Sequence, residues 1–166
     1  MSNPFQIMHT DGKARTAIFN TSHGQIETPT FMPVASQGSV KTITPDEIRN
    51  IGSNIILSNT YHLMLRPGIE TIGVMGGIHS FMGWSGPILT DSGGFQTFSL
   101  GKLIRISEDG VTFRSHIDGS SRFLSPEKST EYQEIIGADI AMVLDECPAY
   151  NTTDTKLLVS MDRTHR

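Results

Sequence analysis

The sequence has little that would cross-link the chain, anchor it in a membrane or direct it to secretion. It contains one cysteine, Cys147, so no disulfide can form within the chain. No apolar run approaches the roughly 20 residues of a membrane span, and residues 1–5 lack the basic head and apolar stretch of a signal peptide. A single cysteine fits a reducing compartment. We therefore expect a cytoplasmic protein that makes no membrane contact.

An excess of positive charge is also missing. The chain has 13 Lys and Arg residues against 17 Asp and Glu residues, a net charge of −4, and its basic residues are scattered. A phosphate-binding surface normally needs clustered Lys and Arg, so composition alone indicates no nucleic-acid partner. A dinucleotide-binding domain is disfavoured as well, because no Gly-x-Gly-x-x-Gly follows a first strand and residues 73–77 do not fit a P-loop.

What is present indicates an ordinary globular domain of mixed structure. The length of 166 residues suffices for one core, and 37% hydrophobic against 18% charged residues excludes a disordered chain. Extended segments are expected in residues 5–30, around turns at 11–12 and 23–24. A helix should begin after Thr44, with Pro45 and Glu47 completing a capping box, and end near Gly52.

The rest of the sequence alternates between buried strands and helices. Short apolar runs at residues 54–58, 87–90 and 140–144 predict buried strands. A helix is expected over 126–136, between Ser125 and Gly137, and helical character continues from 153 to 166. Residues 103–123 alternate instead, with a hairpin turn at Asp109-Gly110.

This order of elements predicts an α/β fold with parallel strands. Two architectures remain open: a doubly wound sheet, and part of a (β/α)₈ barrel. A complete barrel takes about 250 residues, so this chain would supply about half of one.

A short polar residue follows each predicted buried strand: Asn59, Asp91 and Asp145. Active sites of parallel α/β folds form at this edge because the loops converge there. The alternative for each residue is a cap of a helix or turn. Asp91 precedes Ser92-Gly93-Gly94, where the glycines would let backbone N–H groups approach a ligand closely or would serve a tight turn with positive φ.

Four longer runs resemble signatures of the tRNA-guanine transglycosylases, or queuine tRNA-ribosyltransferases, of the bacterial type. They are residues 28–34 (TPTFMPV), 59–68 (NTYHLMLRPG), 89–96 (LTDSGGFQ) and 145–148 (DECP). The resemblance covers essentially the whole chain. It implies the N-terminal portion of a modified (β/α)₈ barrel, with an antiparallel sheet capping the N-terminal end and a β-hairpin insertion after the third barrel strand.

The resemblance also implies a reaction. These enzymes exchange guanine at the wobble position of tRNA with a GUN anticodon for a 7-deazaguanine, in queuosine biosynthesis. In the bacterial branch the incoming base is 7-aminomethyl-7-deazaguanine; the sequence leaves queuine open as the alternative. Relatives form homodimers or heterodimers. We therefore expect tRNA, a 7-deazaguanine base and a second subunit as partners.

Site roles follow from the same resemblance. Asp145 matches the base-recognising Asp, whose two oxygens suit the adjacent N1 and 2-amino donors of guanine. Asp91 matches the catalytic acid–base, and Asn59 a residue that holds it. Phe95 matches an aromatic ring that stacks on the base; its alternative is a place in the core. Cys147 is expected beside the pocket, and without a basic neighbour it is not a nucleophile.

The predicted substrate-binding set is completed by Ser92, Gly93 and Gly94. The nucleophilic Asp of the family, its Cys-x-Cys-x-x-Cys-plus-His zinc site and its basic tRNA surface are expected beyond Arg166, so residues 1–166 are predicted to be a single incomplete domain without cofactor and inactive alone. No histidine has zinc-ligand spacing with Cys147, and local hydrogen bonds are expected for His62 and His116. The alternatives are a catalytically dead base-binding fragment and a truncated product that does not fold.

Overall fold

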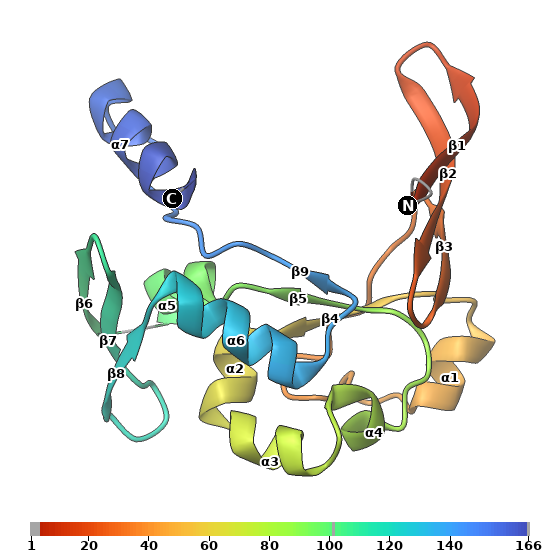
Figure 1. Cartoon of the computed structure of the whole chain (residues 1–166), viewed down its shortest axis with the longest axis horizontal. Helices are drawn as coiled ribbons and strands as arrows, with labels where there is room; N and C mark the ends of the chain where they lie inside the picture. Colours follow the sequence, from red (N-terminus) through yellow and green to blue (C-terminus); the bar gives the residue numbers. More distant parts are fainter. Residues whose placement is uncertain (1–3, 101, 166) are drawn as a thin grey trace.

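Three parallel strands form the centre of the computed structural model, which describes residues 4–100 and 102–165. Strands β4 (Ile56–Asn59), β5 (Ile88–Asp91) and β9 (Ile140–Ala141) pair in the order β4-β5-β9. They cross the middle of the molecule side by side (Figure 1). The predicted α/β class is confirmed. Three parallel strands are common to an open sheet and a partial barrel, so the barrel stays a prediction.

Helices connect the parallel strands, as the α/β class requires. Helices α2 (Thr60–Leu65), α3 (Ile69–Val74) and α4 (Ile78–Met82) lie between β4 and β5, and α6 (Pro126–Ile136) precedes β9. The ends of α6 confirm the predicted caps: the Ser125 side chain accepts from the Lys128 amide, and Gly137 is left-handed at φ 78°. Helices α2 to α4 escaped prediction because five or six residues are too few to show a helical period.

Helix α1 (Pro45–Asn50) begins with the predicted capping box. The Thr44 hydroxyl accepts from the Glu47 amide, and the Glu47 carboxylate accepts from the Thr44 amide at 2.6 Å. Ile51 is the C-cap and Gly52 has a φ of 81°, in agreement with the predicted end. The two reciprocal bonds satisfy amides that a helix start leaves without partners.

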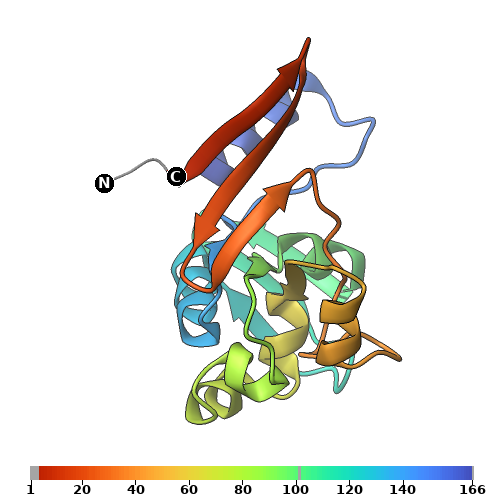
Figure 2. The same ribbon diagram turned by 90° about the vertical axis from the view of Figure 1, so that its right-hand side faces the viewer.

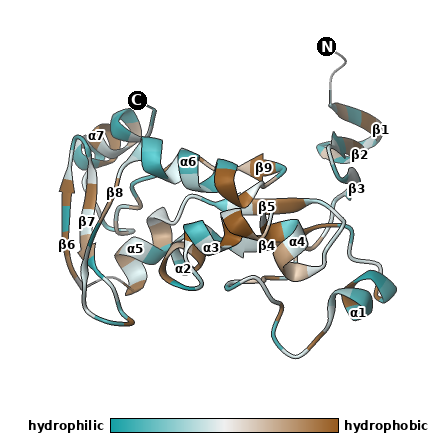
Figure 3. Ribbon diagram, turned by 60° about the horizontal axis from the view of Figure 1, so that its bottom comes forward, coloured by the Kyte–Doolittle hydropathy of each residue, from teal (hydrophilic) through white to brown (hydrophobic). Residues whose placement is uncertain are grey.

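The main core packs between the parallel sheet and its helices. Hydrophobic stretches of β4, β5, β9 and α6 lie together at the centre (Figure 3). Side chains from β4, β5 and the helices around them form one buried cluster: Ala35, Ile48, Ile56, Leu63, Ile69, Ile72, Ile78, Trp84, Ile88 and Ile136. Burial of a side chain of this size stabilises the fold by about 1.5–3 kcal/mol before entropy is counted. This core fixes β4 against β5 and thereby positions the residues that follow them.

The third predicted strand is shorter and less buried than expected. A buried strand over 140–144 is wrong: β9 covers Ile140 and Ala141, and the side chains of Met142 and Val143 are 47% and 66% exposed. Within the described residues β9 pairs on one side with β5 and lies at the sheet edge. A run of apolar residues shows that a segment is hydrophobic, but not how many neighbours cover it.

Two antiparallel sheets lie at opposite ends of the parallel sheet (Figure 1). One joins β1 (Phe5–Asp11), β2 (Ala14–Thr21) and β3 (Gly24–Thr28); the other joins β6 (Lys102–Ser107), β7 (Gly110–Arg114) and β8 (Ser121–Leu124). All three predicted turns are confirmed. The first sheet stands clear of the rest of the chain except at the end that carries the β2–β3 turn (Figure 2).

The remaining helices flank the second antiparallel sheet. Helix α5 (Gly94–Leu100) follows β5, and α7 (Asp154–His165) confirms the predicted helical tail up to residue 165, Arg166 lying outside the described residues. Arg163 of α7 binds Glu108 of the β6–β7 turn at 2.8 Å and also pairs with Glu146. Within residues 4–100 and 102–165, none of the helices is both long enough and apolar enough to cross a membrane.

Candidate functional site

Two of the three polar residues predicted to follow buried strands, Asn59 and Asp91, meet at the carboxyl edge of the parallel sheet, whereas Asp145 lies beyond Ala141, where β9 ends. Asn59 and Asp91 are the last residues of β4 and β5 and lie opposite each other in the strand register. Asn59 donates from Nδ2 to Oδ2 of Asp91 at 2.5 Å. Parallel strands ending side by side explain the contact between residues far apart in the sequence. The pairing of Asn59 with Asp91, expected from the sequence, is present.

The carboxylate of Asp91 is held by four hydrogen bonds. Besides Asn59, the amides of Thr60 and Gly93 donate to Oδ1 at 3.0 and 3.2 Å, and Gln96 Nε2 donates to Oδ2 at 2.8 Å. Thr60 also donates its hydroxyl to the Asp91 carbonyl at 2.6 Å. Four donors fill most of the acceptor capacity of an ionised carboxylate, which therefore has a fixed orientation.

The structure separates the binding and capping alternatives for these two residues. Asn59 is the N-cap residue of α2, but its side chain makes no capping bond and points to Asp91 instead. Asp91 bonds the amide two residues ahead, as in an Asx turn, while also receiving side-chain donors from Asn59 and Gln96. The Asn59 side chain thus does not cap the helix, and Asp91 combines a local turn with contacts that a turn does not need.

The Ser92-Gly93-Gly94 segment serves as a tight turn and as a close approach. Gly93 has a φ of 84°, and a Cβ on Gly94 would lie 2.7 Å from both the carbonyl oxygen and Oδ1 of Asp145. The amides of both glycines donate within the chain, to Asp91 and to Ser92. The segment therefore brings the β5 end against the Asp145 backbone, and its glycine amides are occupied rather than open to a ligand.

A Gly94→Ala substitution should displace Asp145. Any Cβ at 2.7 Å from two oxygens of Asp145 forces the backbone apart, and overpacking of this kind costs about 1–3 kcal/mol. The free energy of unfolding, measured by urea denaturation, should fall by that amount. Gly73→Ala is a matched control, because its Cβ would meet only the Ile135 Cγ2 methyl carbon, at 3.1 Å. Equal stability of the Gly94→Ala chain and the unsubstituted chain would contradict the close approach.

Asp145 lies on the wall of a cavity of about 350 Å³. Its Oδ1 accepts from Ser92 Oγ at 3.3 Å and its Oδ2 from Cys147 Sγ at 2.8 Å. Each oxygen keeps a further lone pair for a ligand. Gly94, Phe98 and Leu144 line the same cavity. Asp145 is thus a carboxylate with two neutral donors and unused acceptor capacity, facing a space of the size typical of small-molecule pockets.

Cys147 is a protonated thiol in this setting. Burial, the hydrogen bond to Asp145 and the negative charge of that carboxylate raise the pKa of Cys147 to about 12. The nucleophile and metal-ligand form of cysteine is the thiolate, so Cys147 is unsuited to either task. The raised pKa gives Cys147 no nucleophilic character, and its place beside a base pocket stays a prediction.

Alkylation of Cys147 by iodoacetamide at pH 8 should be at least about tenfold slower in the native chain than in the chain unfolded in urea. The raised pKa leaves little thiolate at that pH, and the greater nucleophilicity of a more basic thiolate offsets only part of the loss. The unfolded chain is an internal control because it contains the same single cysteine. Asp145→Asn should accelerate the native reaction; equal rates in all three samples would show that Asp145 leaves the thiol unperturbed.

Comparison with known proteins bears on the origin of this site. The family model described as queuine tRNA-ribosyltransferase matches residues 10–166. The chain belongs to this family. The queuine tRNA-ribosyltransferase of Pelotomaculum thermopropionicum is 56% identical over 168 residues, covering 100% of this chain and 45% of the relative. Those of Dehalococcoides mccartyi and Fusobacterium nucleatum are each 55% identical, over 92% and 98% of this chain.

The chain spans less than half the length of these curated relatives, 45%, 39% and 43% respectively. Queuine tRNA-ribosyltransferases are glycosyltransferases, so the matching region belongs to an enzyme family. The structural zinc that the resemblance implies needs three cysteines in a Cys-x-Cys-x-x-Cys run, and this chain has one. Its residues therefore do not form that site.

Phe95, in α5, is 63% exposed and belongs to neither buried cluster of the described residues. Its stacking on a base stays a prediction. His116 is satisfied locally as expected, since its Nδ1 lies 2.9 Å from the Tyr61 hydroxyl. His62 packs edge-on against the Tyr61 ring with centroids 5.4 Å apart.

Two residues of the site were missed by the sequence. Gln96 is a ligand of the Asp91 carboxylate, but lies in a helix that no periodicity revealed. Gln133, 2% exposed, accepts from the Thr90 hydroxyl and the Met142 amide, both at 2.9 Å, and donates to the Met142 carbonyl at 2.9 Å. Gln133 therefore connects the end of β5 to the segment that leads to Asp145. The signal that the sequence offered for Gln133 was a polar residue within the helix predicted over 126–136.

Proposed function

We propose that the chain carries the base-recognition and acid–base part of a tRNA-guanine transglycosylase site. The reaction exchanges guanine at the wobble position of a tRNA with a GUN anticodon for 7-aminomethyl-7-deazaguanine. The observation that carries the proposal is a pair of carboxylates that follow neighbouring strands: Asp91 ends β5, and Asp145 lies in the segment after β9. Asp91 is held by four donors, whereas Asp145 faces a cavity with acceptor capacity to spare.

Asp145 is the proposed base reader. Guanine and 7-deazaguanines present N1–H and a 2-amino group side by side, and a carboxylate accepts both at once. Adenine lacks this pair of donors, so the same contact rejects it. The two donors to Asp145 from Ser92 and Cys147 fix the carboxylate plane without using all its lone pairs.

Asp91 is the proposed proton-transfer group. Breaking and remaking a glycosidic bond requires a proton to be delivered to the leaving base and removed from the incoming one. Asn59 and Gln96 hold the Asp91 carboxylate through side-chain amides. Side chains rotate more easily than backbone, so these two bonds are the ones that substrate would replace. Until substrate binds, the hydrogen bonds from Asn59 and Gln96 keep the Asp91 carboxylate in place.

Phe95 is proposed to stack on the base that leaves the tRNA anticodon. A base must leave its stack to reach such a pocket, and an exposed aromatic ring offers a new stacking partner worth about 1–3 kcal/mol. The 63% exposure of Phe95 supports this role because a buried ring could not meet the base. Ser92, Gly93 and Gly94 form the turn between Asp91 and Phe95, and Gly94 lines the cavity beside Asp145.

The larger assembly is also part of the proposal. The parallel sheet is proposed as the first part of a modified (β/α)₈ barrel, with β1–β3 as its cap and β6–β8 as the insertion. Residues 1–166 then form an incomplete domain of a cytoplasmic enzyme that acts as a homodimer. The nucleophile and zinc ligands are proposed in the region of the relatives that these residues do not match.

A guanine-exchange assay with unmodified GUN tRNA, radiolabelled guanine and the 166-residue chain tests the proposal. We expect no incorporation of label, together with saturable binding of guanine in equilibrium dialysis and a cooperative thermal transition. Incorporation that is abolished by Asp91→Asn would place a complete catalytic set within these residues and contradict the division proposed. A folded chain that binds no guanine would overturn the role of Asp145.

A second candidate is a base-binding module with no part in exchange. The spare acceptor capacity of Asp145 favours it as much as it favours the enzyme. An exchange assay distinguishes the enzyme from the module when the part of a relative that this chain does not match is added as a second polypeptide. Restored exchange that depends on Asp91 supports the enzyme, and base binding without exchange in the mixture supports the module.

A further inference from the structure

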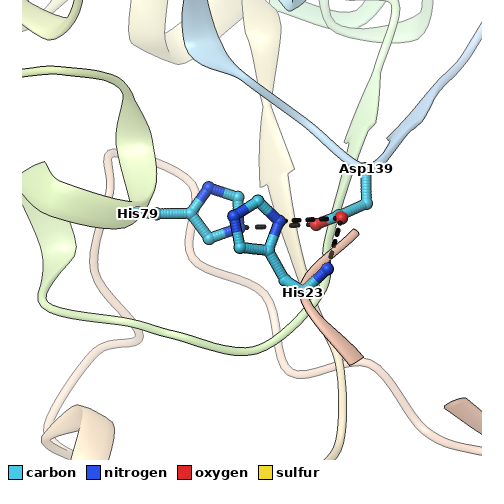
Figure 4. Close-up of side chains that lie close together, drawn as sticks. All are labelled: His23, His79 and Asp139. Carbon is cyan, nitrogen blue, oxygen red and sulfur yellow. Dashed lines mark hydrogen bonds and ion pairs between the residues drawn. The ribbon is translucent and has the colours of Figure 1, made fainter. Parts of the chain in front are cut away.

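A second cluster of side chains lies at the opposite end of the parallel strands, where β5 and β9 begin. His23 comes from the β2–β3 turn, His79 from α4, and Asp139 directly precedes β9. Figure 4 shows both imidazoles directed at one carboxylate. The cluster plays no part in the proposed base exchange.

The three side chains lie close enough together to hold one metal ion. His23 Nδ1 lies 2.8 Å from Asp139 Oδ1, and His79 Nε2 lies 3.4 Å from Asp139 Oδ2. All the ligand atoms fall within 4.8 Å of one another. Two atoms bound to a tetrahedral zinc at about 2.0–2.2 Å are roughly 3.3–3.5 Å apart, so the His79–Asp139 separation fits. The 2.8 Å contact of His23 is a hydrogen bond, and its ring stacks on that of His79 with centroids 3.7 Å apart, so the His23 side chain must turn for both imidazoles to bind one ion.

The environment of His79 leaves its Nε2 in need of a cation. This atom is buried and has no hydrogen-bond partner, although it faces a carboxylate oxygen. Either a proton on Nε2 or a metal ion between Nε2 and Asp139 Oδ2 would satisfy both atoms at this distance.

Asp139 is oriented for both imidazoles by the backbone. The Ile88 amide donates to its Oδ2 at 3.0 Å, and the His23 amide donates to its Oδ1 at 3.2 Å. The Asp139 side chain is 1% exposed, whereas that of His23 is 39% exposed. The carboxylate is thus fixed in the interior, and the exposed His23 side leaves a path for an ion to enter. Outer contacts of this kind, hydrogen bonds made to a ligand and not to the metal, orient the ligands of a metal site.

We propose that His23, His79 and Asp139 bind a divalent transition-metal ion, zinc or a zinc-like ion, with water completing the coordination. Two imidazoles and one carboxylate suit zinc better than magnesium or calcium, which prefer all-oxygen sites. The ion would join the β1–β3 sheet to the strands at the end remote from the base site. Figure 2 shows that this sheet meets the rest of the chain at the end that holds the β2–β3 turn, so the ion would act as a structural clamp.

The test uses ZnCl₂ and CoCl₂ with the 166-residue chain carrying Cys147→Ser, which removes the thiol as a rival ligand. We expect one zinc ion per chain in equilibrium dialysis, a raised melting temperature with zinc, and cobalt absorption typical of low coordination number. Loss of an outer contact weakens metal binding by about 10–100-fold, so loss of a ligand should weaken it by at least about 100-fold. His23→Ala, His79→Gln and Asp139→Asn are the ligand variants.

His9→Ala is the matched control, because this exposed histidine of β1 lies outside the cluster. Its zinc affinity should equal that of the parent. His23→Ala changes a surface turn and keeps the test valid where a variant of a buried residue fails to fold. Zinc binding that is absent, that survives in His23→Ala and Asp139→Asn, or that persists in concentrated urea would overturn the proposal, since the three ligands come together only in the folded chain.

Discussion

The Asp145→Asn chain is expected to bind guanine at least about 100-fold more weakly than the unsubstituted chain. An asparagine keeps one acceptor and turns an NH₂ group toward the second donor of the base, so one charge-assisted bond is lost and two donors oppose each other. Hydrogen bonds to a charged group contribute about 1.5–3 kcal/mol each, and 100-fold corresponds to about 2.7 kcal/mol. Equilibrium dialysis with labelled guanine measures the change.

The control for this variant is Asp162→Asn. Asp162 is an exposed carboxylate of α7, and its substitution removes the same charge away from the cavity. It should leave guanine binding unchanged. Since Asp145 also accepts from Ser92 and Cys147, a thermal melt is needed to show that Asp145→Asn remains folded. Unaltered affinity in a folded Asp145→Asn chain would transfer base recognition to another acidic residue of the cavity, such as Glu127.

Local sequence signals predicted those parts of the fold that depend on neighbouring residues. The capping box at Thr44, the caps of α6 and the hairpin turn at Asp109-Gly110 are each decided within a few residues, and each is confirmed. Polar residues after apolar runs likewise placed Asn59 and Asp91 at one sheet edge, because parallel strands bring their carboxyl ends together.

The sequence did not predict those features that depend on contacts between residues far apart in the chain. The extent of β9 depends on what covers Met142 and Val143, and the ligands of Asp91 include Gln96 in an unpredicted helix. His23 and Asp139 meet across 116 residues, so a search for metal ligands by spacing around Cys147 does not find them. Such contacts form only in the folded chain, so a pattern among neighbouring residues of the sequence does not reveal them.

The Gln133→Met chain should lose about 2–4 kcal/mol of unfolding free energy. Methionine fills a similar volume but offers no partner to the Thr90 hydroxyl or to the Met142 carbonyl, which Gln133 binds in the folded chain. A buried polar group left without a partner costs about 1–3 kcal/mol. The Met142 amide is less affected because it also donates to the Thr90 carbonyl at 3.2 Å. Urea denaturation followed by circular dichroism measures the difference.

The matched control is Glu134→Met on the exposed side of the same helix, which should change stability by less than about 0.5 kcal/mol. Gln133 joins the end of β5 to the segment that carries Asp145, so its loss should weaken guanine binding even in conditions where the chain stays folded. A destabilised Gln133→Met chain that binds guanine normally would show that Asp145 is positioned by Ser92, Gly94 and Cys147 alone. Reduced stability and reduced binding together would make the buried glutamine a positioning residue of the base site.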